Sequence, residues 1–139
     1  MAELWICPKC HRAFRQVNQR HACGTGDKSN LLRGRSEELV QLYRVLEHAV
    51  RECDGVEIVY RDRYVLFRTS RIFADLVMMK DALRLAVHLK RAVQEPLFFK
   101  EVKGERGQIS YVAKIRCREE WQRVKPYLME AYRISIEER

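Results

Sequence analysis

The feature that most constrains this chain is a cluster of metal-binding residue types near its N-terminus. Cys7 and Cys10 form a Cys-x2-Cys pair, and His21 and Cys23 follow with one residue between them. Thiolates and a neutral imidazole are typical ligands of four-coordinate structural zinc, and a Cys-x2-Cys turn lets two sulfurs reach one ion. The cluster therefore predicts a structural Zn²⁺ site made by Cys7, Cys10, His21 and Cys23.

The spacing of the second pair predicts an extended segment rather than a helix. Residues two apart point to the same side of a strand, whereas on a helix they diverge by about 200°. A DNA-reading ββα finger would instead carry two histidines about 13 and 17 residues beyond its second cysteine. Here Cys23 takes the first of those places and Asp27 the second. His11 is a competing ligand, but adjacent residues such as Cys10 and His11 rarely bind one ion without strain.

The chain divides into a small metal-dependent segment, a linker and one larger domain. Residues 1–24 are too few to bury a core, so bound metal must supply most of their stability. Glycines and small polar residues without a period predict a linker over residues 25–35. Residues 36–139 are long enough for one compact domain.

The larger domain is predicted to begin and end with helices. Ser36 is a good N-cap, and apolar residues at spacings of three and four follow it as far as Cys53. A final helix is expected from about Arg118, with a kink or a late start at Pro126. Strands are predicted over residues 56–60, 64–69, 72–79, 83–89, 97–103 and 108–116.

These elements predict an α+β fold. It consists of the zinc knuckle, a helix, an antiparallel meander sheet of about five to six strands and a C-terminal helix, with both helices on one sheet face.

Positive charge is concentrated in two parts of the chain. The net charge is +8, and residues 1–35 and 61–91 each carry +5. Such clusters favour a polyanion such as nucleic acid, although basic surfaces also promote solubility. The candidate nucleic-acid contacts are Arg12, Arg15 and Arg20 of the knuckle and Arg61, Arg63, Arg68, Arg84 and Lys90 of the sheet.

Several segments resemble a known bacterial family. Trp5 before Cys-Pro-Lys-Cys, Phe14, and the run from Asn18 to Gly24 are similar to a zinc knuckle in the domain-of-unknown-function family 5655. Residues 65–89, especially 71–74, and residues 130–132 also resemble that family. The resemblance implies an α+β domain after the knuckle and the ligands Cys7, Cys10, His21 and Cys23, and it brings no established activity.

An enzyme is a weaker interpretation than a binding protein. Glu101 and Lys103, with Asp81 or Asp75 upstream, resemble the acid and Glu-x-Lys pattern of Mg²⁺-dependent nucleases. Alternating charges on a solvent-facing strand are the commoner explanation. A closed zinc site with four protein ligands also leaves no open position for hydrolysis.

A protein-interaction adaptor is the main alternative, with Tyr111 or Phe98 as exposed docking residues and a purely structural zinc. No apolar run is long enough to span a membrane, and a signal peptide is not expected, because the sequence contains no charged-then-apolar stretch that resembles one. Five cysteines, including a Cys-x2-Cys pair, fit a reducing compartment, so a cytoplasmic protein is expected. Cys53 and Cys117 are expected to be buried filler.

Overall fold

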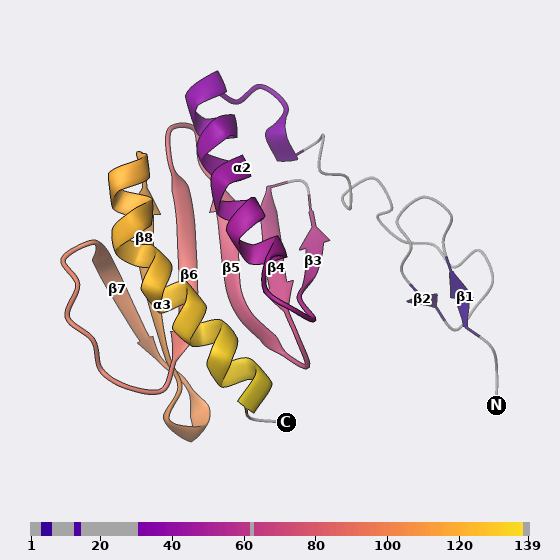
Figure 1. Ribbon diagram of the computed structural model, residues 1–139, viewed down its shortest axis with the longest axis vertical. Helices are drawn as coiled ribbons and strands as arrows, with labels where there is room; N and C mark the ends of the chain where they lie inside the picture. Colours follow the sequence, from indigo (N-terminus) through magenta and orange to yellow (C-terminus); the bar gives the residue numbers. More distant parts are fainter. Residues whose placement is uncertain (1–3, 7–12, 15–30, 62, 138–139) are drawn as a thin grey trace.

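The computed structural model describes residues 4–6, 13–14, 31–61 and 63–137 (Figure 1). Within these residues, two long helices and a six-stranded antiparallel sheet confirm the predicted α+β class. None of the described helices is long and apolar enough to cross a membrane. The strands of the large sheet are β3 (Glu57–Tyr60), β4 (Tyr64–Arg68), β5 (Ile72–Met78), β6 (Leu83–Leu89), β7 (Phe98–Lys103) and β8 (Ile109–Ile115), with the short 3₁₀ helix η2 (Glu105–Gly107) before β8.

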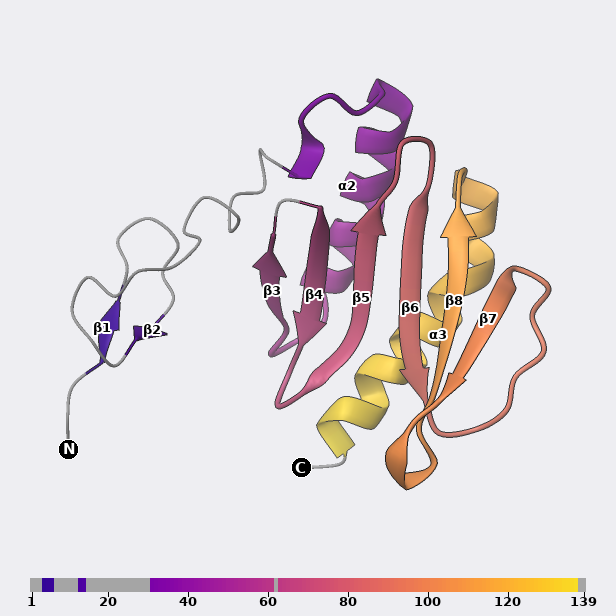
Figure 2. The same cartoon turned by 180° about the vertical axis from the view of Figure 1, so that it is seen from behind.

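Both helices lie on the same face of the sheet. Helix α2 spans Glu37–Arg51 and helix α3 spans Arg118–Glu137. They lie in front of the strands in Figure 1 and behind them in Figure 2. This agrees with the prediction that one face of the sheet carries both helices.

Helix α2 begins where the sequence predicts. The Ser36 hydroxyl accepts a hydrogen bond from the Leu39 amide at 3.2 Å, which satisfies one of the free amides of the first turn. Glu37 and Glu38 lie in that turn, where the helix dipole favours acidic side chains. The stripe that α2 buries consists of Leu39, Leu42, Tyr43, Leu46, Glu47 and Val50.

Helix α3 begins at Arg118 and continues through Pro126, so the predicted late start at Pro126 is wrong. Trp121 lies before the proline, is 1% exposed and belongs to the common core. Burying this large side chain stabilises the first part of the helix, even though Pro126 lacks an amide for the helical ladder. The Phe73 ring of β5 meets Tyr132 edge-on, with ring centroids 5.7 Å apart.

The end of the sheet departs from a simple meander. The strand order is β3-β4-β5-β6-β8-β7, so β8 pairs with β6 and β7 lies at the edge. Strand β8 buries most of its residues, whereas nearly all of β7 is exposed. Alternating Lys100, Glu101 and Lys103 suit β7 to an edge, because charged side chains discourage pairing with another chain.

A second, two-stranded sheet lies near the N-terminus. Strand β1 (Trp5–Ile6) pairs antiparallel with β2 (Ala13–Phe14). The segment that connects them contains Cys7 and Cys10, and its structure lies outside the described residues.

Candidate functional site

The sheet face opposite α2 and α3 presents side chains away from the core, and we call it the open face. Leu83, Leu85 and Val87 of β6 are buried toward the helices. The residues between them, including Arg84 and His88, are half-buried and point the other way because successive side chains alternate along a strand. Among the described elements, none lies over the open face in Figure 2.

Strand register places four residues side by side across the open face. Tyr64 of β4 is opposite Val77 of β5, and Val77 is opposite Arg84 of β6. Arg84 in turn is opposite Lys114 of β8. We call such a line of directly paired residues across the strands a level of the sheet. On the β3 side of Tyr64, the Arg61 amide donates to the Tyr64 carbonyl at 2.9 Å, so Arg61 lies at the same level just beyond the end of β3. Directly paired residues project to one face, so all of these side chains share it.

A β-bulge adds an aromatic ring to this level. Between Phe98 and Lys100, one step along β8 corresponds to two steps along β7, and Phe99 is the extra residue. The Phe99 ring is contacted by both cations, with Arg84 Cζ 5.7 Å and Lys114 Nζ 5.3 Å from its centroid. We call the set Arg61, Tyr64, Val77, Arg84, Lys114 and Phe99 the transverse row.

The electrostatics of the transverse row favour an anion. Arg84 and Lys114 are like charges in directly opposite positions, which destabilises a sheet. Within the described part of the chain, neither forms an ion pair. The one carboxylate of the neighbouring level is Asp75, and burial raises its pKa while Arg84 lowers it. A bound anion would relieve the repulsion between the two cations.

The predicted basic residues of the sheet divide between its two ends. Arg61 and Arg84 belong to the transverse row, and exposed Arg63 precedes Tyr64 at the same end. Arg68 is the last residue of β4 and Lys90 follows β6, so both lie at the far end of the sheet.

At that far end both basic residues have partners within the protein. Arg68 Nε lies 3.6 Å from a carboxylate oxygen of Glu57. Lys90 Nζ donates to the Arg106 carbonyl at 2.8 Å. The structure therefore does not bring the five predicted sheet residues together on one site.

Sequence reasoning missed Lys114, Phe99 and Tyr64. Tyr64 and Phe99 are 41% and 52% exposed. The sequence indicated only that these aromatic and basic residues lie in predicted strands. The strand register was needed to show that they lie side by side across the sheet.

A polar cluster centred on His88 also lies on the open face. The Ser110 hydroxyl is 2.7 Å from His88 Nδ1, and Asp75 Oδ2 is 3.9 Å from His88 Nε2. Gln108 accepts from Arg71 through Oε1 at 2.9 Å, which turns its amide nitrogen toward His88 Nδ1 at 3.4 Å. Nδ1 is thus the acceptor nitrogen of a neutral ring. Burial, with Arg71 as a second cause, lowers the pKa of His88.

This cluster lacks the surroundings of a nucleophile site. Ser110 lies in an interior strand, where it pairs with His88 on one side and Val102 on the other. The backbone amides at this position serve the ladders, so they are not arranged to stabilise an oxyanion. We regard the cluster as a polar part of the open face.

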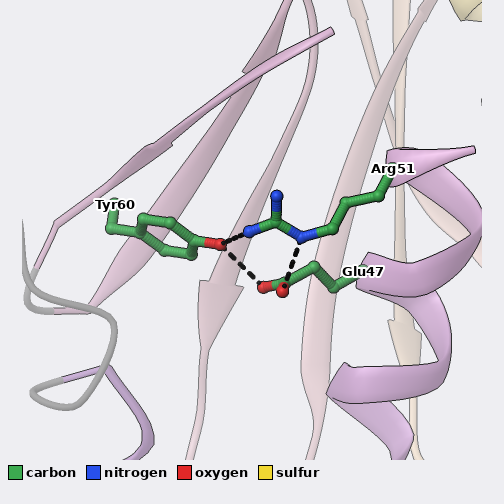
Figure 3. A network of polar contacts seen from close by, with 3 residues as sticks. All are labelled: Glu47, Arg51 and Tyr60. Atoms are coloured by element: carbon green, nitrogen blue, oxygen red, sulfur yellow. Dashed lines mark hydrogen bonds and ion pairs between the residues drawn. The ribbon is translucent and has the colours of Figure 1, made fainter. Parts of the chain in front are cut away.

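A network around the buried carboxylate of Glu47 fixes the edge strand β3, which leads into Arg61 (Figure 3). Glu47 of α2 is 4% exposed. Its carboxylate accepts from Arg51 Nε at 3.1 Å and from the Tyr60 hydroxyl at 3.0 Å. Arg51 also donates to the Tyr60 hydroxyl at 2.6 Å. Burial and then Glu47 raise the pKa of Tyr60 to about 12.

Burial, followed by contacts with Glu47, also raises the pKa of Tyr43, the neighbouring phenol on α2. Because Tyr60 points toward α2, the next residue, Arg61, projects to the open face. The network thus positions one end of the transverse row.

The structure separates the residues of the nuclease alternative. Asp75 is paired with Ala86 on the open face, whereas Glu101 is paired with Tyr111, which belongs to the core on the helix side. Three inter-strand steps also lie between β5 and β7. Asp75 and Glu101 therefore do not share one metal ion in this arrangement.

The two aromatic residues of the adaptor alternative belong to the core side of the sheet. Tyr111 is 3% exposed, and its hydroxyl accepts from the Val93 amide at 3.0 Å. The Phe98 ring packs against Tyr111 and Tyr127, with centroids 5.1 and 5.2 Å away. Neither is a surface docking residue, whereas the adjacent Phe99 is half-exposed.

The two remaining cysteines differ in exposure. Cys53 is half-buried, and its thiol contacts Met129 with 3.6 Å between the sulfurs. Burial raises its pKa, in agreement with the predicted filler role. Cys117 is exposed, so the prediction that it is buried is wrong. It precedes α3, outside the apolar strand pattern that ends at Ile115.

The predicted metal ligands Cys7, Cys10, His21 and Cys23 lie outside the described residues, as do Arg12, Arg15 and Arg20. The part of the chain that the structure does describe contains no group of three or more His, Cys, Asp or Glu side chains that could hold a metal ion. The pairing of β1 with β2 is compatible with the expected zinc ligands. It brings the residues before Cys7 next to the residues after Cys10, as a Cys-x2-Cys turn requires.

Comparison with protein families gives one match. The model described as "Domain of unknown function (DUF5655)" matches residues 28–135. The matched segment contains α2, the whole large sheet and most of α3, and it begins after the four expected zinc ligands. Comparisons with curated proteins and with solved structures gave no match.

Proposed function

The chain belongs to the DUF5655 family, and we propose that it is a zinc-stabilised binding protein whose open face contacts nucleic acid. The observation that carries the proposal is the transverse row. It places three cations and two half-exposed aromatic rings at one level of the sheet, with no carboxylate among them. Cations provide the phosphate contacts that dominate nucleic-acid affinity.

In this proposal, zinc bound by Cys7, Cys10, His21 and Cys23 gives shape to a segment that is too small to fold alone. Arg12, Arg15 and Arg20 of that segment supply further phosphate contacts. The donor set and the flanking β1–β2 pairing support the zinc site.

The test is a binding titration of the full chain against nucleic acid at several salt concentrations. The three cations Arg61, Arg84 and Lys114 alone predict a slope of about −2 to −3 in log affinity against log salt, and contacts from Arg12, Arg15 and Arg20 make it steeper. The three contacts alone lower the affinity about 16- to 64-fold between 50 and 200 mM salt. The variant Arg84→Gln weakens binding and reduces the slope by about one contact.

The matched control is Arg133→Gln, which removes the same charge from an exposed position of α3. Equal losses in both variants would mean that net charge alone attracts the ligand. Binding that is absent, or that does not respond to salt, rejects the proposal.

A protein-interaction adaptor is the second candidate. Phe99 and Val102 of the edge strand β7 are 52% and 46% exposed, and an exposed edge strand can accept a strand from a partner. In that case Phe99→Ala reduces binding to a protein partner, and added salt has little effect.

A further inference from the structure

The surroundings of Phe99 narrow the class of nucleic acid. Its ring is 52% exposed and is contacted by the guanidinium of Arg84 and the ammonium of Lys114. An exposed ring flanked by cations suits a ligand with both a flat π-surface and negative charge. Unpaired nucleotides have both, because their bases present free faces next to their phosphates.

We propose that the open face binds single-stranded nucleic acid, with a base stacked on Phe99 and phosphates at Arg84 and Lys114. This rests on the proposed nucleic-acid function and names its substrate class. A strand that runs along the transverse row reaches a second ring at Tyr64, which is 41% exposed.

The dimensions of the row agree with a single strand. Strands β4 and β7 are four inter-strand steps apart, which separates Tyr64 and Phe99 by about 19 Å at the usual spacing. Arg84 and Lys114 lie between the two aromatic positions. Two stacking platforms with cations between them match two non-adjacent bases of one strand and the intervening phosphates of its backbone.

The shape of the open face disfavours a duplex. The six strands make this face about 24 Å wide, twice the width of the major groove of B-DNA, at about 12 Å. A duplex also keeps its bases stacked on one another, so the ring of Phe99 would gain nothing from it. Phosphate contacts alone would remain.

A cavity of about 570 Å³ lies beside Phe99 at the β7 edge. Its lining includes Phe98 and Tyr111 of the core side and the carboxylates Glu95 and Glu101, as well as Phe99 and Lys100. Because of these carboxylates we place the stacked base on the open face, beside Arg84 and Lys114, and not in the cavity.

The experiment compares single strands with a duplex of the same sequence, about 12 nucleotides long, by fluorescence anisotropy with the full chain. Single-stranded DNA and RNA are both measured, since the stacking argument does not distinguish them. We expect single strands to bind at least about tenfold more tightly than the duplex at equal salt.

Variants of Phe99 test the stacking contact itself. Phe99→Leu keeps an apolar side chain and should weaken single-strand binding about tenfold without changing the salt slope. Phe99→Tyr keeps an aromatic ring and should retain the affinity, which separates loss of the ring from disturbance of β7. Circular dichroism and a thermal melt verify that each variant is folded.

Two outcomes would overturn the inference and leave the proposed function in place. One is duplex binding as tight as single-strand binding, and the other is equal affinity for Phe99→Leu and the wild type. Failure to bind either form would instead reject the proposed function.

Discussion

Removing Arg51 tests the buried network that holds β3 against α2. In Arg51→Met the Glu47 carboxylate, whose side chain is only 6% exposed in the native protein, loses the Arg51 guanidinium. The Tyr60 hydroxyl still donates to it, as the 3.0 Å contact indicates. A buried charge that loses its counter-charge is strongly destabilising, because water cannot replace the missing partner.

The magnitude follows from the burial of the two partners. Breaking a fully buried ion pair costs about 3–5 kcal/mol. The Arg51 side chain is 55% exposed, so water screens its end of the pair and the retained Tyr60 bond moderates the loss. We expect Arg51→Met to lower the free energy of unfolding by about 2–3 kcal/mol.

Urea unfolding at pH 7 measures this change, with Arg44→Met, an exposed position on the same helix, as the control. The control should stay within about 0.5 kcal/mol of the wild type. The double variant Glu47→Leu with Arg51→Met should recover most of the loss, because no buried charge remains. If Arg51→Met matched the wild type, or the double variant were the least stable, the reasoning would be refuted.

Three further predictions concern the metal, the open face and its charge. Purified protein should carry one zinc ion per chain by metal analysis, reduced by Cys10→Ser and unchanged by Cys117→Ser. Asp75→Asn should stabilise the fold at neutral pH. Because the folded-state pKa of Asp75 is raised by burial, stability is lost as pH rises through that pKa, and urea midpoints of the two proteins should converge below pH 3.8. Lys114→Glu should raise the urea midpoint by creating an opposite-charge pair with Arg84, yet weaken nucleic-acid binding; a loss of both would assign Lys114 a structural role.

The secondary structure was largely readable from the sequence because local patterns determine it. Leu83–Leu89 alternates apolar and polar residues, and the structure buries every second one. Ser36 caps α2 through its hydroxyl, as its position before two glutamates predicts. The predicted late start of the last helix at Pro126 was wrong because packing around Trp121 outweighs the one hydrogen bond that the proline cannot make.

The transverse row was not readable because it depends on register and on strand order. Arg84 and Lys114 are thirty residues apart in the chain and become neighbours only because β8, rather than β7, pairs with β6. The residue types of β7 and β8 did indicate this order. Charged side chains suit an edge strand such as β7 because they discourage pairing with another chain, whereas the apolar β8 suits an interior position. Counting basic residues along the sequence instead grouped Arg68 and Lys90 with Arg84.

The bulge at Phe99 connects the fold to the proposed function. In a regular strand, two adjacent residues face opposite sides, and a shift of one residue would send the wrong phenylalanine to the core. Phe98 packs beside Tyr127 and Phe99 lies on the open face beside Arg84, and the extra residue lets Lys100, not Phe99, pair with Val112. The half-exposed Phe99 ring gains cation–π contacts with Arg84 and Lys114 in place of core packing. In the proposed complex a base stacks on this ring and its phosphate contacts the two cations, so Phe99 is the position at which the proposed substrate class is tested.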